Sequence, residues 1–185
     1  MADGTLKVGT ITTSSGSGTI TLGQSGETIA LGATTNNLLT PAFHAYIGSD
    51  QTGISDATDT KLQINTEDYD TDNCYDSSTN YRFTPTVAGK YFVYSVCEIF
   101  CTSGQVNQGY LKFYFNGSEL SNSNTYWNLY DGSNGAQFIA PYVARVITFN
   151  GTSDYVEMYG HLDGNTNVTN AKFATKTFFG AYRII

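Results

Sequence analysis

The stretch from Lys90 to Phe100 restricts the fold of this chain more than any other part of the sequence. Apolar side chains occupy both of its faces, with Tyr91, Val93, Cys97 and Ile99 on one and Phe92, Tyr94, Val96 and Phe100 on the other. Alternation with a period of two indicates a β-strand. A strand that is apolar on both faces needs cover on both. We therefore predict a central strand that packs against an opposing sheet on one side and a neighbouring subunit on the other.

The rest of the chain after Thr40 alternates short strand-like segments with turn residues. Segments 41–47 and 61–65 alternate apolar and polar residues, as half-buried strands do. Asn116-Gly117 and Asn150-Gly151 each follow a further apolar run, and Asn-Gly favours a hairpin because both central residues of that turn need positive φ. We predict roughly eight to ten strands and no helix, arranged as an all-β, double-sheet antiparallel sandwich or jelly roll.

The charge balance restricts the partners. Sixteen acidic and nine basic side chains give a formal charge of −7, which repels nucleic acid and anionic membranes. The first residues lack the charged and apolar parts of a signal peptide, and no segment approaches the ~20 apolar residues of a membrane span. We therefore expect a soluble protein made in a cytoplasm, and we expect Cys74, Cys97 and Cys101 to be reduced thiols, because three cysteines cannot all pair.

Residues 1–40 differ in kind from the rest. A nine-residue repeat places Ile11, Ile20 and Ile29 at equal spacing in Thr-rich segments bounded by Gly and Ser. Each repeat has too few apolar residues to bury a core alone, so burial needs neighbouring copies or a partner. We predict a β-repeat stalk or attachment arm in 1–40 and a globular head in 41–185. A flexible Gly/Ser/Thr linker is the alternative.

The acidic segment 67–76 is the richest polar cluster. Asp68, Asp70 and Asp72 begin like an EF-hand loop, but Asn73 replaces the sharp-turn Gly and Thr79 replaces the bidentate Glu. We therefore predict a solvated acidic loop and no metal or cofactor. A weaker calcium site of another type is the alternative.

Enzymatic chemistry has no support in the sequence. The two histidines stand in no nucleophile motif, and no Gly-x-Ser-x-Gly segment occurs. We therefore predict a non-enzymatic protein, with a glycan hydrolase kept for contrast. Tyr126, Trp127 and Tyr130 lie in an Asn/Ser-rich stretch. They are candidate contacts for a surface ligand such as a sugar or a protein, with ordinary core packing as the alternative.

The head resembles a known family. The resemblance is based on Ala42-Phe43, Lys61 to Asn65, Tyr75-Asp76, Tyr81-Arg82-Phe83-Thr84-Pro85, Gly89-Lys90-Tyr91-Phe92-Val93, Phe115-Asn116-Gly117 and Phe178-Phe179-Gly180-Ala181-Tyr182. They are similar to the globular heads of the complement first-component q chains and the tumour necrosis factor ligands. The resemblance implies a ten-strand jelly roll that forms a homotrimer. The contacts near the three-fold axis would be Phe43, Tyr91, Val93, Phe179 and Tyr182.

Two departures from that family direct the functional prediction. The collagen-like stalk of the complement proteins is replaced by the Thr-Ile repeat, and no signal peptide precedes it. Heads of this type on short β-repeats resemble small virion proteins of tailed bacteriophages. The resemblance implies a structural virion component, a capsid decoration, cement or head-fibre protein on the virion surface, attached through its arm to a major capsid protein or tail adaptor. The alternative is a receptor-binding tail-fibre tip that contacts host glycan or protein.

Overall fold

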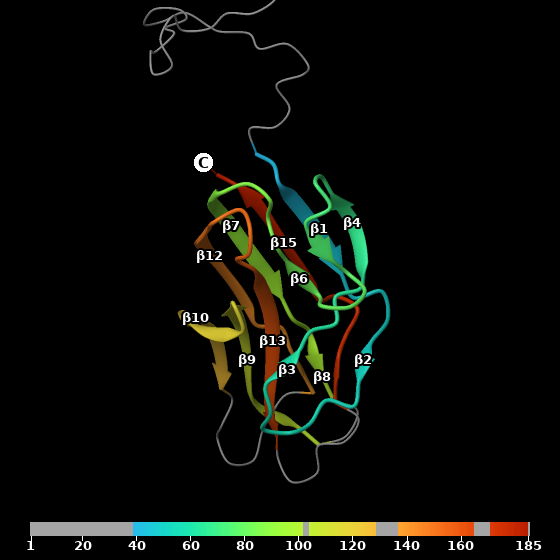
Figure 1. Ribbon diagram of the computed structural model, residues 1–185. Helices are drawn as coiled ribbons and strands as arrows, with labels where there is room; N and C mark the ends of the chain where they lie inside the picture. The colour runs from blue at the N-terminus through green and yellow to red at the C-terminus, as the bar shows by residue number, and fades with distance from the viewer. Residues whose placement is uncertain (1–38, 102–103, 129–136, 165–170, 185) are drawn as a thin grey trace, which may run out of the picture. The chain divides into compact units, whose positions relative to one another are not determined.

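The computed structural model in Figure 1 describes residues 39–101, 104–128, 137–164 and 171–184. These residues belong to one structural unit, Asn36–Ile185. They form strands and no helix, and the described part of the chain accordingly contains no helix that could cross a membrane. The prediction of an all-β fold is confirmed for this part of the chain.

The first layer is a five-stranded antiparallel sheet in the order β12, β7, β15, β1, β4. Its strands are β1 (Ala42–Tyr46), β4 (Thr66–Asp70), β7 (Gly89–Val96), β12 (Tyr142–Phe149) and β15 (Phe178–Arg183). Strand β7 pairs with β12 on one side and with β15 on the other. The predicted central strand is therefore confirmed.

A short sheet has the order β11, β8, β14, β2 and continues the first layer. In it β11 takes the position of β12, and β8 takes the position of β7. Its strands are β11 (Phe138–Ile139), β8 (Ile99–Phe100), β14 (Lys172–Phe173) and β2 (Gln51–Thr52). The predicted unbroken strand 90–100 is therefore wrong in one respect. It divides at Cys97 and Glu98, because the Glu98 amide donates to the Thr177 hydroxyl instead of to a neighbouring strand.

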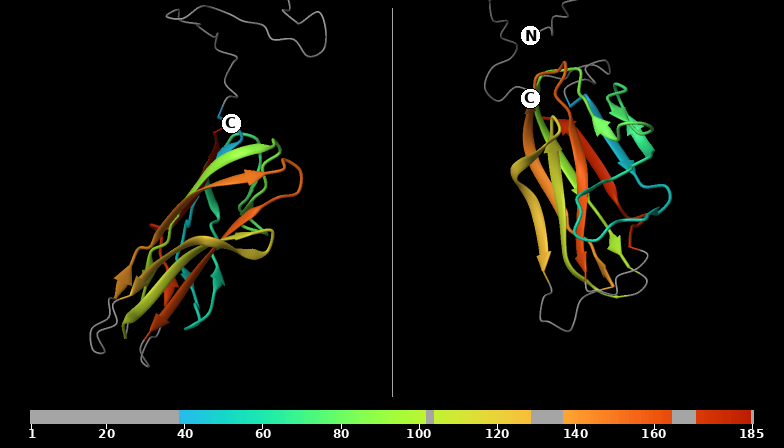
Figure 2. Two further views of the ribbon diagram at one scale, coloured as in Figure 1. Left: turned by 90° about the vertical axis from the view of Figure 1, so that its left-hand side faces the viewer. Right: turned by 60° about the horizontal axis from the view of Figure 1, so that its bottom comes forward.

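The second layer has the order β10, β9, β13, β6, β5, with β3 also paired to β13. Its strands are β3 (Thr60–Lys61), β5 (Tyr75–Asp76), β6 (Arg82–Phe83), β9 (Val106–Phe115), β10 (Ser118–Asn128) and β13 (Val156–Gly164). The two layers lie face to face (Figure 2). This arrangement is the predicted double-sheet antiparallel jelly roll.

The two Asn-Gly turns differ. Asn116 and Gly117 both have positive φ, 51° and 81°, and connect the paired strands β9 and β10, so the first predicted hairpin is confirmed. The second is wrong, because β12 and β13 lie in different layers. There Gly151 alone has positive φ, and the Asn150 side chain accepts the amides of residues 152–154.

The segment 61–65 is a third difference from the sequence prediction. Only Lys61 belongs to a strand, β3, and the next strand begins at Thr66. Leu62 and Ile64 are nonetheless buried. Alternation therefore predicted the burial of these side chains correctly, but this connection between the layers forms no ladder of its own.

The core between the layers is built on aromatic rings. Phe43 packs at 4.5 Å from Tyr75, 4.7 Å from Phe83 and 4.9 Å from Phe179, measured between ring centroids. These rings come from both layers, so aromatic pairing links the two sheets directly. Cys74, Cys97 and Cys101 are buried as free thiols, and burial raises the pKa of each of them.

Replacing Phe43 by Ala should lower the free energy of unfolding by about 3–5 kcal/mol, because it leaves a cavity where three rings meet. Urea denaturation followed by circular dichroism measures the change. The control is Val87→Ala at an exposed position, which should change the stability by less than about 0.5 kcal/mol. Equal stability of the Phe43→Ala variant and the wild type would contradict the packing described here.

Candidate assembly interface

The outer side of the first layer is covered by aromatic and small side chains. We call it the aromatic face, and its members occupy alternate positions on five adjacent strands. In rows across the sheet they are Tyr142, Val96, Phe178 and Tyr46, then Ala144, Tyr94, Gly180, His44 and Tyr69, then Val146, Phe92, Tyr182 and Ala42. The cross-strand register places these side chains together, since paired residues point to the same side of a sheet.

The rings of the aromatic face contact one another across the strands. The His44 ring lies 5.4 Å from Phe178 and 6.1 Å from Tyr94, and Phe92 lies 5.5 Å from Tyr182, all between centroids. The Tyr94 ring lies across Gly180, where any side chain would collide with it. The face is therefore a continuous packed layer and not a set of separate rings.

Much of this layer is exposed in the single chain. The exposed fraction is 67% for Tyr142, 48% for Tyr69 and for Val146, and 39% for Tyr182. Burial raises the pKa of Tyr94 to about 12, so its hydroxyl stays neutral at ordinary pH. Within the aromatic face, His44 alone can carry a positive charge, and its Nδ1 lies 2.7 Å from the Asp68 carboxylate. An exposed surface made mostly of apolar rings is typical of a protein interface.

A second apolar patch, which we call the edge patch, lies where β10 and β12 approach each other across the sandwich. Trp127 on β10 is 43% exposed. It pairs with Gly109, which leaves room for the Ile139 side chain. Farther along β10, near its Leu120 end, a groove of about 280 Å³ is lined by Phe115, Leu120, Arg145, Val146, Ile147 and Thr148. The edge patch therefore offers a concave apolar surface next to the aromatic face.

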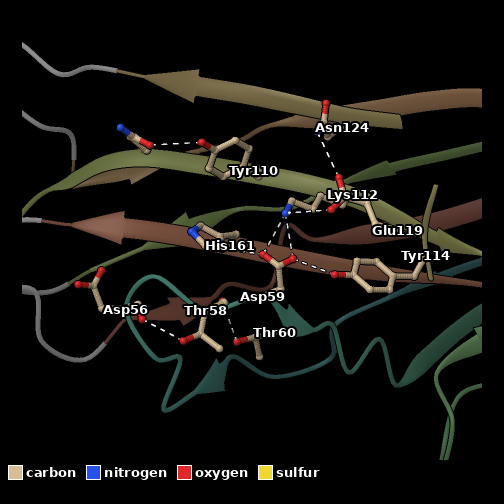
Figure 3. A network of polar contacts seen from close by, with 11 residues as sticks. Asp56, Thr58, Asp59, Thr60, Tyr110, Lys112, Tyr114, Glu119, Asn124 and His161 are labelled. Carbon is tan, nitrogen blue, oxygen red and sulfur yellow. Dashed lines mark hydrogen bonds and ion pairs between the residues drawn. The ribbon is translucent and has the colours of Figure 1, made fainter. Parts of the chain in front are cut away.

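The outer face of the second layer has the opposite character (Figure 3). The Asp59 carboxylate lies 2.9 Å from Lys112 Nζ, 2.6 Å from His161 Nδ1 and 2.8 Å from the Tyr114 hydroxyl. Burial raises the pKa of Asp59, but these hydrogen bonds outweigh it and leave the pKa below its ordinary value. A second ion pair joins Lys61 to the buried Glu157. Ion pairs of this kind suit a surface in contact with water, unlike the aromatic face.

Four of the five predicted interface residues lie elsewhere. Phe43, Tyr91, Val93 and Phe179 point between the layers and have 0% exposure, while Tyr182 lies on the aromatic face. A side chain without exposed area cannot contact a second copy unless the core opens. The sequence could not separate the two sides of β7, because both are apolar.

The other predicted site residues are only partly described. Tyr126 and Trp127 lie on opposite faces of β10 and are both exposed. Ile11, Ile20, Ile29 and Tyr130 lie outside the described residues. The edge patch and the Asp59 network escaped the sequence analysis, because each brings together residues far apart in the chain.

The carboxylates of the acidic segment 67–76 do not point toward one common site. The Asp68 carboxylate binds His44, Asp70 accepts the Tyr75 amide at 2.7 Å, and Asp72 accepts the Thr71 hydroxyl. Asp76 caps the turn that follows it: backbone donors, that of Thr79 first, hold its pKa well below the ordinary range. Among the described residues no group of three or more metal-ligating side chains is placed to hold an ion. The absence of a calcium requirement stays a prediction.

Comparison with known proteins shows the fold of the chain. No protein-family model and no curated protein matches the sequence. Among solved structures, murine APRIL has a TM-score of 0.54 at 11% identity, covering 77% of this chain and 98% of its own. Eiger TNF from S. frugiperda scores 0.55 at 8% identity, covering 78% of this chain and 92% of its own. The chain therefore has the jelly-roll fold of the tumour necrosis factor ligands, and the complement part of the predicted resemblance stays a prediction.

A virion protein has the same fold. The vertex protein P5 of phage PRD1 has a TM-score of 0.54 at 12% identity, and the match covers 80% of this chain and 99% of P5. The fold is thus found both in signalling ligands and in a phage particle. The fold alone does not distinguish these two settings, so the function has to be argued from the surfaces.

The Asp59 network should make stability depend on pH in acid. Because the pKa of folded Asp59 is lowered, its contribution is complete above the unfolded value of about 3.9 and is lost as the pH falls through the lower folded value. Asp59→Asn should lower the free energy of unfolding at pH 7 by about 1–3 kcal/mol. In this variant the free energy of unfolding should also decrease less steeply between pH 4 and pH 2 than it does in the wild type.

Urea unfolding at pH 7, 4 and 2 measures both effects. The control variant is Glu67→Gln, since the Glu67 carboxylate is exposed and has no hydrogen bond within the described residues. It should keep the acid slope of the wild type. An Asp59→Asn variant with an unchanged slope would show that the network contributes nothing to folding.

Proposed function

We propose that this chain is a non-enzymatic structural component of a bacteriophage virion, which forms a homotrimer and attaches through its N-terminal arm. The single observation that carries the proposal is the aromatic face, because a largely apolar exposed surface serves assembly better than catalysis or exposure to water. The phage vertex protein with the same fold supports a place on a particle.

The symmetry of a trimer fits the two apolar patches. A three-fold ring uses heterologous contacts, in which one surface of each copy meets a different surface of the next. The aromatic face and the edge patch are two such surfaces on neighbouring sides of one chain. We propose that the edge patch of each copy, with Trp127 and Leu120, packs on the aromatic face of the next. Aromatic anchors of this kind carry most of the energy in protein interfaces.

The position of the chain ends supports attachment at one end of the head. The Arg183 amide donates to the Leu39 carbonyl, so both ends of the described chain meet at the same end of the sandwich. The short sheet of β2, β8, β11 and β14 extends toward the other end (Figure 1). The arm is therefore joined to the head at the end of the sandwich opposite the short sheet.

A capsid decoration, cement or head-fibre role is the finer proposal. The repeat around Ile11, Ile20 and Ile29 provides the apolar attachment segment that this role needs. Its partners would be further copies of the chain and a neighbouring virion protein such as the major capsid protein. The protein would then be found on the virion surface.

Trimer formation is tested by placing a charge on the aromatic face. Phe92→Glu should weaken the trimer at least about 100-fold, because a carboxylate buried without a partner costs about 3–5 kcal/mol. Light scattering coupled to size exclusion measures the mass at micromolar concentration. Gln63→Glu adds a carboxylate at an exposed position outside both patches and should leave the trimer intact. A monomeric wild type would refute the assembly.

Attachment is tested in the full-length chain. Replacing Ile11, Ile20 and Ile29 together by Ser removes the apolar side chains of the repeat and leaves the head unchanged. The variant should still form trimers, yet purified particles should carry far fewer copies of it than of the wild type, as counted by quantitative immunoblotting. Equal decoration by both proteins would place the attachment element outside the repeat.

A further inference from the structure

Three rings form a row across the outer face of the second layer. Tyr126 on β10 pairs with Tyr110 on β9, which pairs with His161 on β13. The centroids of Tyr126 and Tyr110 are 4.8 Å apart, and those of Tyr110 and His161 are 5.1 Å apart. Tyr126 is 46% exposed on this otherwise polar face. The Tyr126 and Tyr110 rings are tilted by 33°, and the His161 ring stands at 87° to Tyr110. We call this row the platform, and the exposed Tyr126 ring is the part of it on which a ligand can stack.

Polar side chains flank the platform one step along the strands on each side. Gln108 and Asp163 pair with each other on one side, and Asn124 pairs with Lys112 on the other. Each step of two residues along a strand is about 6.8 Å. Gln108 accepts the Tyr110 hydroxyl through its oxygen, which leaves the amide group free to donate. The Asp163 carboxylate has no hydrogen bond within the described residues and can accept two hydroxyls.

The polar network around Asp59 holds the neighbours of Tyr110 in place (Figure 3). Asp59 binds Lys112 and His161, which both contact Tyr110. Lys112 Nζ lies 5.3 Å from the centre of the Tyr110 ring. A ring whose neighbours are fixed loses little conformational freedom on binding, and this preorganisation favours affinity for a small ligand.

We infer that this surface is a binding site for a neutral glycan. The apolar C–H face of a hexose stacks on an exposed aromatic ring, while its hydroxyls need planar amides and carboxylates at the ring edge, as Gln108 and Asp163 provide. The local charge decides the class of sugar. Lys112 Nζ lies 2.9 Å from Asp59 and 3.5 Å from Glu119, so one ammonium group faces two carboxylates. Asp163 adds a third carboxylate, and the whole chain carries a charge of −7. The field therefore repels sialylated and sulfated sugars.

The site lies on the opposite layer from the aromatic face, and Tyr126 points to the opposite side of β10 from Trp127 of the edge patch. It therefore stays accessible when these two surfaces are covered by neighbouring copies. Its occupation neither requires nor prevents the proposed trimer. The two proposals can consequently fail separately. On a virion surface such a site would hold the particle against polysaccharide of the host.

The test measures binding of the full-length chain to lactose, maltotriose, chitotriose and sialyllactose, each immobilised on a sensor surface. At least one neutral saccharide should bind more strongly than sialyllactose. Tyr126→Ala should weaken that binding at least about tenfold, whereas Tyr126→Phe keeps the ring and should stay within about threefold. Phe138→Ala, an exposed aromatic position on the first layer, should bind as the wild type does.

Failure to bind any neutral saccharide would overturn the inference, as would preference for sialyllactose or an unchanged affinity of Tyr126→Ala. Light scattering on the same samples reports the oligomeric state. A trimer that binds no sugar would overturn the glycan site alone. A monomer that binds lactose through Tyr126 would overturn the proposed assembly alone.

Discussion

The structure depends on one constraint, which is that strand β7 has apolar side chains on both sides. Its inner side chains, Tyr91 and Val93, have no exposed area because they meet the rings of the opposing layer. Its outer side chains, Phe92 and Tyr94, take part in the aromatic face. A central strand of this kind fixes the layer order and leaves the outer side in need of cover. Fold and assembly thus follow from the same strand.

The two outer surfaces of the sandwich differ in chemical character. The first layer presents rings with almost no charge, and the second presents ion pairs around Asp59 and Glu157. Removing paired charges from water costs more free energy than their attraction usually restores. Covering apolar rings, in contrast, lowers the free energy of association by about 25 cal/mol per Å². This asymmetry is the reason why we propose the first layer for the contact with a second copy and the second layer for a soluble ligand.

Much of the local structure could be predicted from residue pattern alone. The all-β class, the central strand and the Asn116-Gly117 hairpin follow from period-two alternation and from the φ that this turn requires. The errors have physical causes as well. Asn150-Gly151 has the same sequence but caps a connection between layers with its side chain. The break after Val96 arises from the Thr177 hydroxyl, which lies far away in the chain.

The sequence by itself determined that this protein is a β-sandwich with more apolar surface than one chain can bury, because period and composition are local properties. Only the tertiary structure decided that Phe43, Tyr91, Val93 and Phe179 are core residues and that Phe92 and Tyr94 are not. Alternation separates the two sides of a strand but does not tell which side faces inward when both are apolar. The Asp59 network, the edge patch and the ring platform likewise arise only when distant segments meet, as Asp59 and His161 do across 102 positions. No local pattern encodes that distance, so these surfaces become visible only when the strands are paired.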